Sequence, residues 1–417
     1  MGKRIDTKHG WRRSVLLKVM AVSLGALLAS GAAQGQMPTV PQELEAKIAS
    51  HPHVRQLTTW GSRPDWSGDS RHLLFVSKEY GDVFELDVVT GRIRPMTFHF
   101  PHKGFFRAYY LANGDILLTG ARDWQPESRR FGRYFDSEVW LMKADLSAPP
   151  VPLGIFNFEG IAVDRNSMRI AWSAPPQRDP VRRTDRQMFS TPDGFRTDRN
   201  QIWVGEISLA GGKPEVINRR VVADCGDRAS KLNAMLAERH LHCGMLEPQN
   251  FVPGPGDRLT ATTVGVPDGK VMTGLDPAMR IDAITIALGT GDTTQLSRTP
   301  PYNEPEGIFP DGRNTMVEHT SAPMDVETTE KIDLWQLATD GSGKMRRVTR
   351  YNLIDPRLKS NQPVISPDGR WMAFDVSTGE IERAVPGQGV GLFLMDLRAA
   401  GFTSAAPAPR RPKRGRR

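Results

Sequence analysis

The chain has 417 residues, of which 39% are hydrophobic and 24% charged, so it can bury one large core or two ordinary ones. Its 39 Gly and 32 Pro residues favour many turns over long helices. The formal net charge of +8 resides at the two ends: residues 1–35 carry +5 and residues 410–417 carry +6, which leaves −3 for the remainder. This mildly acidic body has no electrostatic reason to bind nucleic acid.

Residues 1–35 have the pattern of an export signal. A basic stretch precedes the apolar run at 14–29, and small residues follow, with a cleavage site expected at 33–35. The apolar run is short and contains Lys18, so we expect removal of the segment and no stable membrane anchor. The pair Arg12-Arg13 leaves two routes open, a twin-arginine signal or an ordinary secretory signal. The mature protein is therefore expected in the periplasm or outside the cell.

Two further segments flank the body of the chain. Residues 36–52 are expected to form an extended leader with a small helix that packs on the body. Residues 403–417, TSAAPAPRRPKRGRR, have the composition of a disordered tail. Two interpretations stand for this tail: a solvated segment that aids solubility, or a contact with an anionic surface such as phospholipid or lipopolysaccharide.

The body, residues 53–402, is built from a repeated unit. Each unit has a short apolar segment, a turn with Gly and Asp or Asn, and a second alternating segment. The clear copies are RPDWSGDSRHLLFVS (63–77), RAYYLANGDILLTG (107–120), EGIFPDGRNTMVEH (306–319) and QPVISPDGRWMAFDVS (362–377), with looser copies at 159–173 and 249–263. Asn-Gly and Asp-Gly between apolar runs indicate hairpins, because Gly tolerates positive φ in tight turns.

A third and a fourth strand follow in each unit. The third alternates apolar and polar residues, as in DVFELDVVTG (82–91) and IDLWQLATDG (332–341). The fourth is a short phrase, as in RIRPMT (92–97), KMRRVT (344–349) and DTTQLS (292–297). Four antiparallel strands per unit and about six units predict an all-β, six-bladed β-propeller.

The spacing of the turns leaves one alternative for the blade count. Asp164 and Pro253 lie 89 residues apart, which is enough to hold a seventh blade. The excess falls at 177–199 and 225–243, neither of which has a strand pattern, and the second resembles a short helix. We therefore predict six blades, with seven as the alternative.

The last unit ends without its fourth strand, and a matching phrase occurs before the first unit, in HVRQLTTW (53–60). A propeller must close its ring, because an unpaired sheet edge is otherwise left open. We predict that Val54–Thr59 pairs with Gly391–Leu397 and closes the ring.

The only cysteines are Cys225 and Cys243. In an oxidising compartment an isolated pair favours a disulfide. His240 and His242 lie beside Cys243, which leaves a zinc site as the alternative, but the grouping lacks the usual spacing of paired ligands.

The motifs SPDGRWMAF (366–374), WSGDSRHLLF (66–75) and FPDGRNTMV (309–317) resemble those of the TolB-type, WD-like propeller family of exported bacterial proteins. The resemblance covers about residues 53–397 and implies the propeller fold and export. TolB itself has an α/β domain ahead of its propeller, which residues 36–50 are too short to supply. The resemblance therefore implies a fold rather than a role in the Tol system.

No catalytic residue stands out. Peptidases that carry such a propeller need a Gly-x-Ser-x-Gly nucleophile elbow, which the chain lacks. Oligogalacturonate lyases resemble this architecture and hold a divalent metal with a His cluster and a Gln. Here His99 and His102 lie between the first two units, without histidines at matching positions elsewhere. We predict no metal and no cofactor, and keep a carbohydrate lyase or hydrolase as the alternative function.

The innermost strand of each blade lines the central channel of a propeller, and its start opens onto one face. Aligning the units places six polar residues near these starts: Arg63, Arg107, Glu159, Gln249, Glu306 and Gln362. Glu304 and Glu306, two residues apart, are expected on one side of an extended strand. The leading hypothesis is a non-catalytic, exported propeller that binds a protein or a cell-envelope polymer at this channel mouth.

A metal analysis of the purified mature protein tests this hypothesis. We expect no metal in stoichiometric amount, because the histidines do not recur between units as a ligand set requires. A stoichiometric metal, measured by mass spectrometry after dialysis, would contradict the binding hypothesis and favour the lyase alternative.

Overall fold

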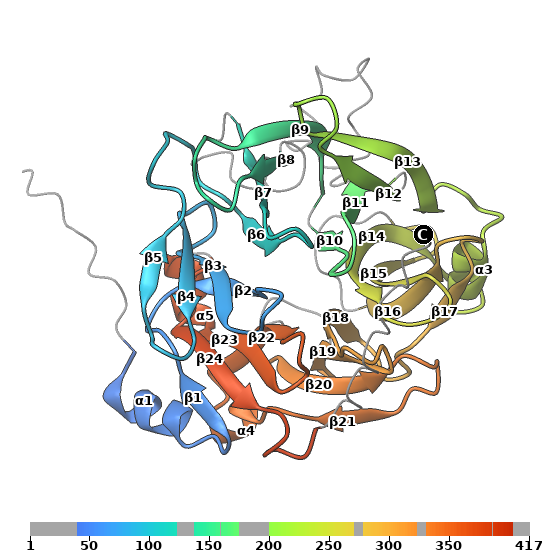
Figure 1. Ribbon diagram of the computed structural model, residues 1–417. Coiled ribbons are helices and arrows are strands. Elements are labelled where there is room, and N and C mark those ends of the chain that lie inside the picture. Colours follow the sequence, from blue (N-terminus) through green and yellow to red (C-terminus); the bar gives the residue numbers. More distant parts are fainter. Residues whose placement is uncertain are drawn as a thin grey trace, which may run out of the picture. The chain divides into compact units, whose positions relative to one another are not determined.

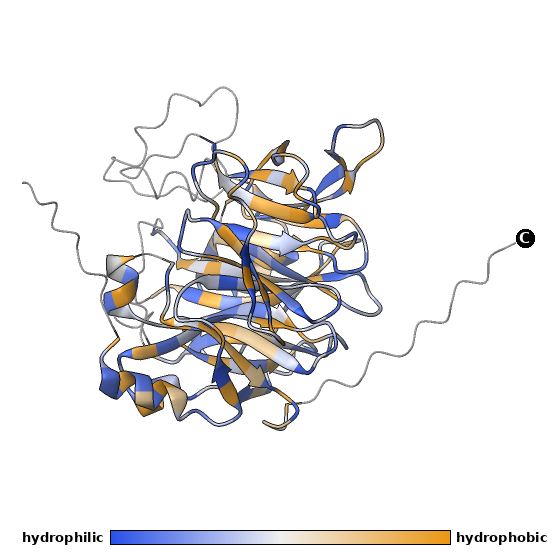
Figure 2. Cartoon of the chain, turned by 60° about the vertical axis from the view of Figure 1, so that its left-hand side comes forward, coloured by the Kyte–Doolittle hydropathy of each residue, from blue (hydrophilic) through white to orange (hydrophobic). Residues whose placement is uncertain are grey.

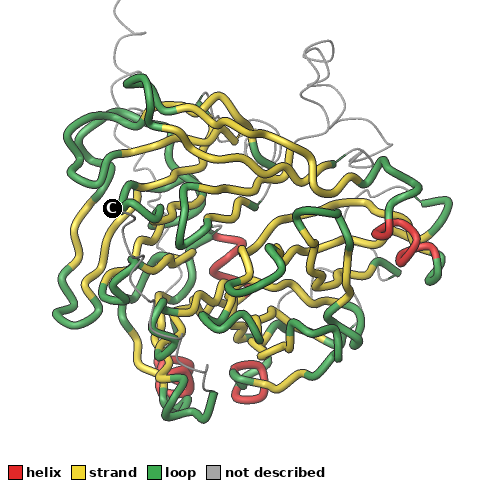
Figure 3. The backbone as a smooth tube through the Cα atoms, turned by 45° about the vertical axis from the view of Figure 1, so that its right-hand side comes forward, coloured by secondary structure: helices red, strands yellow, loops and turns green. Residues whose placement is uncertain are grey.

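The computed structural model describes residues 40–122, 137–158, 160–174, 200–270, 278–322, 331–385 and 387–402. The predicted export signal and basic tail lie outside these residues. Within them the chain is almost entirely β-structure with a few short helices (Figures 1 and 3). No helix of this part combines the length and the apolar character that crossing a membrane requires.

The first three sheets each contain four antiparallel strands in chain order. The first is formed by β2 (Ser62–Trp66), β3 (His72–Val76), β4 (Val83–Asp87) and β5 (Ile93–Pro95). The second is formed by β6 (Arg107–Tyr110), β7 (Ile116–Ala121), β8 (Ser137–Met142) and β9 (Val151–Phe156). The third is formed by β10 (Ile161–Val163), β11 (Arg169–Ala174), β12 (Gln201–Ser208) and β13 (Glu215–Asp224).

The fourth and fifth units repeat this order. The fourth is formed by β14 (Leu241–Val252), β15 (Arg258–Pro267), β16 (Arg280–Ala287) and β17 (Thr293–Gln295), and the fifth by β18 (Tyr302–Ile308), β19 (Asn314–Thr320), β20 (Asp333–Ala338) and β21 (Met345–Arg347). A single parallel pairing of Ile281 with Tyr302 links these two units into one sheet. Within each unit all pairings are antiparallel, so we count them as separate blades.

The sixth unit contains β22 (Leu358–Ile365), β23 (Trp371–Thr378) and β24 (Gly391–Asp396), and β1 (Val54–Gln56) completes it. The sheets surround a common centre, with β2, β6, β10, β14, β18 and β22 innermost (Figure 1). The predicted all-β propeller is confirmed, and the described strands divide into six four-stranded blades.

Hairpin turns of the same construction connect the inner two strands of the first and sixth blades. Ser67 Oγ lies 2.5 Å from Asp69 Oδ1, and the His72 backbone N–H donates to Ser67 Oγ at 2.9 Å. The same two contacts recur between Ser366 and Asp368 and between Trp371 and Ser366. Small polar side chains thus close the turns that the Asp and Gly signals predicted.

The hydrophobic core lies between neighbouring blades rather than inside any one of them. Hydrophobic and hydrophilic residues are mixed along the strands (Figure 2), as expected for sheets that pack face to face. Each major cluster draws on two adjacent blades, with representative pairs Leu74 and Leu118, Leu141 and Ile170, Ile202 and Leu259, Ala283 and Val317, Met316 and Phe374, and Leu73 and Ala373. A blade therefore cannot bury its apolar residues without both neighbours.

Ring closure occurs where it was predicted. Val54 pairs with Met395 and Gln56 with Phe393 in antiparallel register. Beyond this short strand, the Leu57 N–H donates to the Leu392 carbonyl at 2.8 Å, and the Thr58 hydroxyl accepts from the Leu392 N–H at 2.9 Å. The regular pairing covers three residues of β1, fewer than the predicted Val54–Thr59.

The residues ahead of β1 pack on the sixth blade. Helix α1 (Gln42–Ala49) buries Leu44 and Ile48 in the cluster between the fifth and sixth blades. Lys47 forms an ion pair with Asp355 at 2.8 Å, just after the short helix α4 (Tyr351–Ile354). Another short helix, α5 (Gly379–Ala384), lies between β23 and β24.

A disulfide joins Cys225 and Cys243, whose Cα atoms lie 5.0 Å apart. It spans the excursion between the third and fourth blades, which contains helix α3 (Lys231–Ala237). Leu232 and Leu236 of this helix are buried in the cluster between those blades. The excursion is therefore a helical insertion rather than an additional strand unit.

Deleting residues 53–59 should destabilise the propeller far more than deleting residues 403–417. The first deletion removes the β1 ladder and the bonds of Leu57 and Thr58, at about 1 kcal/mol net for each hydrogen bond, so we expect a loss of about 3–5 kcal/mol in the free energy of unfolding. Denaturant titration of both variants measures the difference. Equal losses would contradict closure by β1.

Candidate functional site

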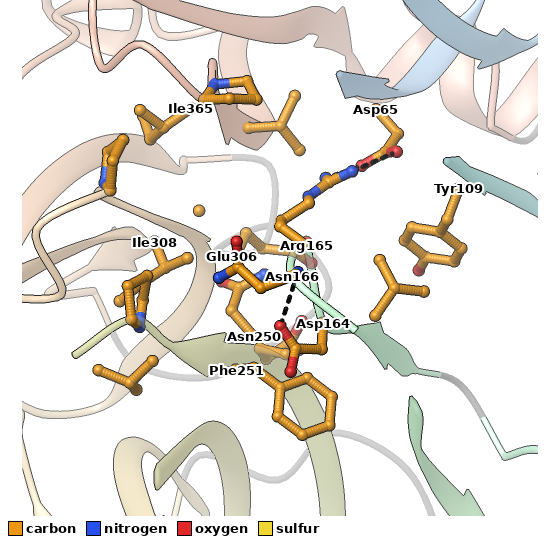
Figure 4. Close-up of a pocket in the computed structure, with 18 of the residues that line it drawn as sticks. Asp65, Tyr109, Asp164, Arg165, Asn166, Asn250, Phe251, Glu306, Ile308 and Ile365 are labelled. Carbon is orange, nitrogen blue, oxygen red and sulfur yellow. Dashed lines mark hydrogen bonds and ion pairs between the residues drawn. The ribbon is translucent and has the colours of Figure 1, made fainter. Parts of the chain in front are cut away.

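The six innermost strands enclose a central cavity of about 580 Å³. Residues from all six blades form its wall, from the inner strands to the hairpin turns that follow them (Figure 4). The wall thus consists of inner strands and of the short hairpin turns that follow them. We call this space the central cavity.

Four of the residues predicted for the channel mouth lie on the wall of this cavity: Arg63, Arg107, Gln249 and Glu306. Gln362 does not line it, although Val364 and Ile365 of the same strand do. Glu159 lies outside the described residues. Their role in ligand binding stays a prediction.

The residues on the wall are largely shielded from solvent. Arg63, Gln249 and Glu306 are each only 7% exposed.

Most of the residues predicted for the channel mouth lie at irregularities of their strands, which the alignment of the repeated units did not show. The strand register shifts at four inner strands, and the residues within the shifts include Arg63, Gln249, Glu306 and Gln362. Two of them, Arg63 and Gln362, have positive φ values of 58° and 55°. A β-bulge inserts an unpaired residue and re-aims its side chain. The bulges therefore set the direction of these polar side chains.

Arg107 and Glu306 form an ion pair between the second and fifth blades, with 3.4 Å between Nη2 and Oε1. Burial by itself lowers the pKa of Arg107, but the nearby charges, including those of Glu306, Glu247 and Glu304, raise it above its usual range. Arg107 thus stays charged in the interior and pairs with the carboxylate of Glu306.

Arg63 lies beside this pair. Its guanidinium carbon is 4.0 Å from the centroid of the Phe106 ring, a cation–π distance. Its backbone N–H donates to the Asp375 carboxylate, which is buried behind it. Burial and the negative charge of Glu382 raise the pKa of Asp375 to about 7.

A carboxylate cluster lies beside Arg107: Glu247, Glu304 and Glu306 act on Arg107 itself, and Glu304 and Glu306 act on Glu318. The Tyr302 hydroxyl donates to Glu304, and the Gln362 backbone N–H donates to Glu318 at 2.7 Å. Burial and the charges of Glu304 and Glu306 raise the pKa of Glu318 well above its usual range. Of these four residues, Glu306 is the one that reaches the cavity wall.

At the other end of the cavity, Arg165 spans three blades (Figure 4). From the hairpin turn of the third blade it forms an ion pair with Asp65 of the first blade and donates to the Trp66 carbonyl at 2.9 Å. Asp65 also accepts from the Tyr110 N–H of the second blade at 2.8 Å. Sequence reasoning missed this bridge, and the one available signal was Asp65, a second charged residue in the inner strand that contains Arg63.

The two loop histidines lie elsewhere. Neither His99 nor His102 lines the central cavity. His102 Nε2 is 3.0 Å from Asp82 Oδ1, and His102 Nδ1 accepts from the Gly104 N–H at 2.9 Å. His102 borders a separate pocket of about 320 Å³ beside Phe105 and Trp140. Across the described ranges, no group of three or more His, Cys, Asp and Glu side chains has an arrangement suited to a metal.

The fold and the cavity define a β-propeller with a charged central cavity. No protein-family model and no curated protein matches the sequence. Similar solved structures include an oligogalacturonate lyase from Vibrio parahaemolyticus, with 10% identity, a TM-score of 0.43 and coverage of 82% of this chain and 93% of the lyase. TolB from Acinetobacter baumannii has 10% identity, a TM-score of 0.35 and coverage of 83% and 72%. Likeness at this level concerns the fold alone.

The buried carboxylate of Asp375 generates a prediction about pH. Because its folded-state pKa of about 7 lies above the usual value, the folded protein holds a proton that the unfolded chain releases, and stability is lost as pH rises from about 4 through 7. Asp375→Asn has no proton to lose. The free energy of unfolding of Asp375→Asn minus that of the native chain should therefore increase by about 1–3 kcal/mol from pH 5 to pH 8.

The matched control is Asp340→Asn in an exposed turn. A hydrogen bond from Ser342 lowers the pKa of Asp340, so this group stays charged throughout the same pH window. Urea titrations at several pH values compare the three proteins. A pH profile of Asp375→Asn parallel to that of the native chain would contradict the assignment.

Proposed function

We propose that this protein is an exported, non-catalytic binding module whose ligand, a protein segment or a cell-envelope polymer, enters the central cavity. The observation that carries the proposal is the cavity itself, which all six inner strands enclose. Its volume of about 580 Å³ falls within the range of sites that bury small ligands.

The chemistry of the wall supports recognition of a ligand with both polar and apolar parts. Arg107 and Glu306 supply charge, while Tyr109, Phe251 and Ile308 supply apolar surface on the same wall. A few fixed polar groups on an apolar wall give orientation and specificity. The ion pairs of Arg165 and Arg107 hold these groups in place before a ligand arrives.

Export is supported by two features. The leader pattern of residues 1–35 is that of a removable signal, and the Cys225–Cys243 disulfide suits an oxidising compartment. The alternative function, a carbohydrate lyase or hydrolase, gains no specific observation from the described residues. Binding is therefore the function that the cavity supports best.

A variant that closes the cavity tests the proposal. Asn166 lies on the cavity wall in an exposed hairpin turn, so Asn166→Trp should fill the entrance without disturbing the core. Thermal-shift and calorimetric screens against tripeptides and envelope oligosaccharides should find a ligand of the native protein whose affinity falls at least roughly tenfold in this variant.

The control is Ala112→Trp, which adds the same side chain to an exposed turn of the second blade outside the cavity lining. This variant should bind as the native protein does. A ligand that binds equally well to both variants would contradict binding in the central cavity.

A further inference from the structure

The charged residues that line the central cavity differ in their balance from those buried behind the lining. Four arginines and four carboxylates line the wall, so the lining is balanced. Behind it the balance shifts toward negative charge, with Glu247, Glu304, Glu318 and Asp375 all buried or nearly so. Arg107 and Lys359 lie among these carboxylates, and each is already in an ion pair, Arg107 with Glu306 at 3.4 Å and Lys359 with Glu382 at 2.7 Å. Beyond the effect of burial, the nearby carboxylates raise the pKa of Arg107 and that of Glu318 alike, which indicates a negative field beside Glu306.

Two buried side-chain oxygen atoms near Arg63 have no hydrogen-bond donor among the described residues. Asn361 is 7% exposed and Asp375 1% exposed, and the Oδ1 atoms of both lack a donor. The Asp375 carboxylate accepts a hydrogen bond from the backbone N–H of Arg63, a residue of the cavity wall. Asn361 pairs with Asp375 across β22 and β23. On the cavity wall, Asn250 Oδ1 also lacks a donor. Asn250 is the one of these three residues that lines the cavity, and its free acceptor favours a ligand that brings an N–H donor.

Part of the cavity wall is apolar and suits the aliphatic stem of a ligand side chain. Tyr109, Phe251, Ile308 and Ile365 line the same cavity as Glu306 and lie around it in Figure 4. A lysine or arginine side chain places methylene groups against such surface while its charged end reaches a carboxylate. A phosphate or carboxylate at this position would meet Glu306, whose partner Arg107 is already engaged in the ion pair.

We propose that the ligand is a peptide segment that inserts a lysine or arginine side chain into the central cavity, with its cationic end at Glu306. This inference rests on the proposed function and names the ligand class of the same cavity. Glu306 is already 3.4 Å from Arg107, a long ion-pair distance that leaves its carboxylate able to accept from a second cation.

Three blocked tripeptides test the inference by calorimetry on the mature chain: Ala-Lys-Ala, Ala-Glu-Ala and Ala-norleucine-Ala. The lysine peptide should bind saturably, and the norleucine peptide at least roughly tenfold more weakly, because it keeps the stem and lacks the charge. Glu306→Gln should weaken binding of the lysine peptide by a similar factor. Glu306→Asp keeps the negative charge and should weaken binding less than Glu306→Gln does.

Glu215→Gln, at an exposed position of β13, is the matched control and should bind the lysine peptide as the native chain does. Unchanged binding in Glu306→Gln, or no saturable binding of the lysine peptide, would overturn the inference. If Glu306→Gln does not fold, two other results decide the question. The inference holds if the lysine peptide binds more tightly than the other two peptides and if Asn166→Trp loses this binding, and it is wrong otherwise.

The proposed function and this inference fail in different ways. If the glutamate peptide binds in preference and Asn166→Trp abolishes that binding, the cavity remains the binding site and the cationic ligand is wrong. If the lysine peptide binds equally well to Asn166→Trp, both proposals are wrong for this ligand.

Discussion

The structure depends on one constraint: every blade must find a neighbour on both sides. The hydrophobic clusters lie between blades, so a ring that fails to close would expose two apolar faces at once. Pairing of β1 with β24 ties the two ends of the ring together across more than 330 residues of sequence, in the register Val54 to Met395. Closure also fixes the distance of the inner strands from the centre, and with it the width of the central cavity.

That width explains the electrostatics of the cavity. Because the inner strands meet closely, side chains from blades that are not neighbours come within ion-pair distance, as with Arg107 and Glu306 or Arg165 and Asp65. Burial there strengthens each interaction and raises the cost of an unpaired charge. The raised pKa values of Glu318 and Asp375 follow from the same crowding of carboxylates in a space with little water.

Much of the fold was predictable because it is written in local patterns. Asp-Gly and Asn-Gly turns between alternating segments indicate hairpins wherever they occur, and a repeated hairpin pair needs a closed ring to bury its faces. The candidate site was predictable only in part. Aligning the units found Arg63, Arg107, Gln249 and Glu306, but gave no sign that three of them lie in bulges or that Arg165 reaches across two blades.

The sequence by itself therefore determined the repeat, the antiparallel pairing within each blade and the strand that closes the ring, since these follow from periodicity and turn chemistry. Only the tertiary structure decided which polar residues face one another, how deeply they are buried and which carboxylates share a space. The physical reason is that strand periodicity sets the face on which a side chain lies, whereas bulges and contacts between distant blades set where that side chain ends.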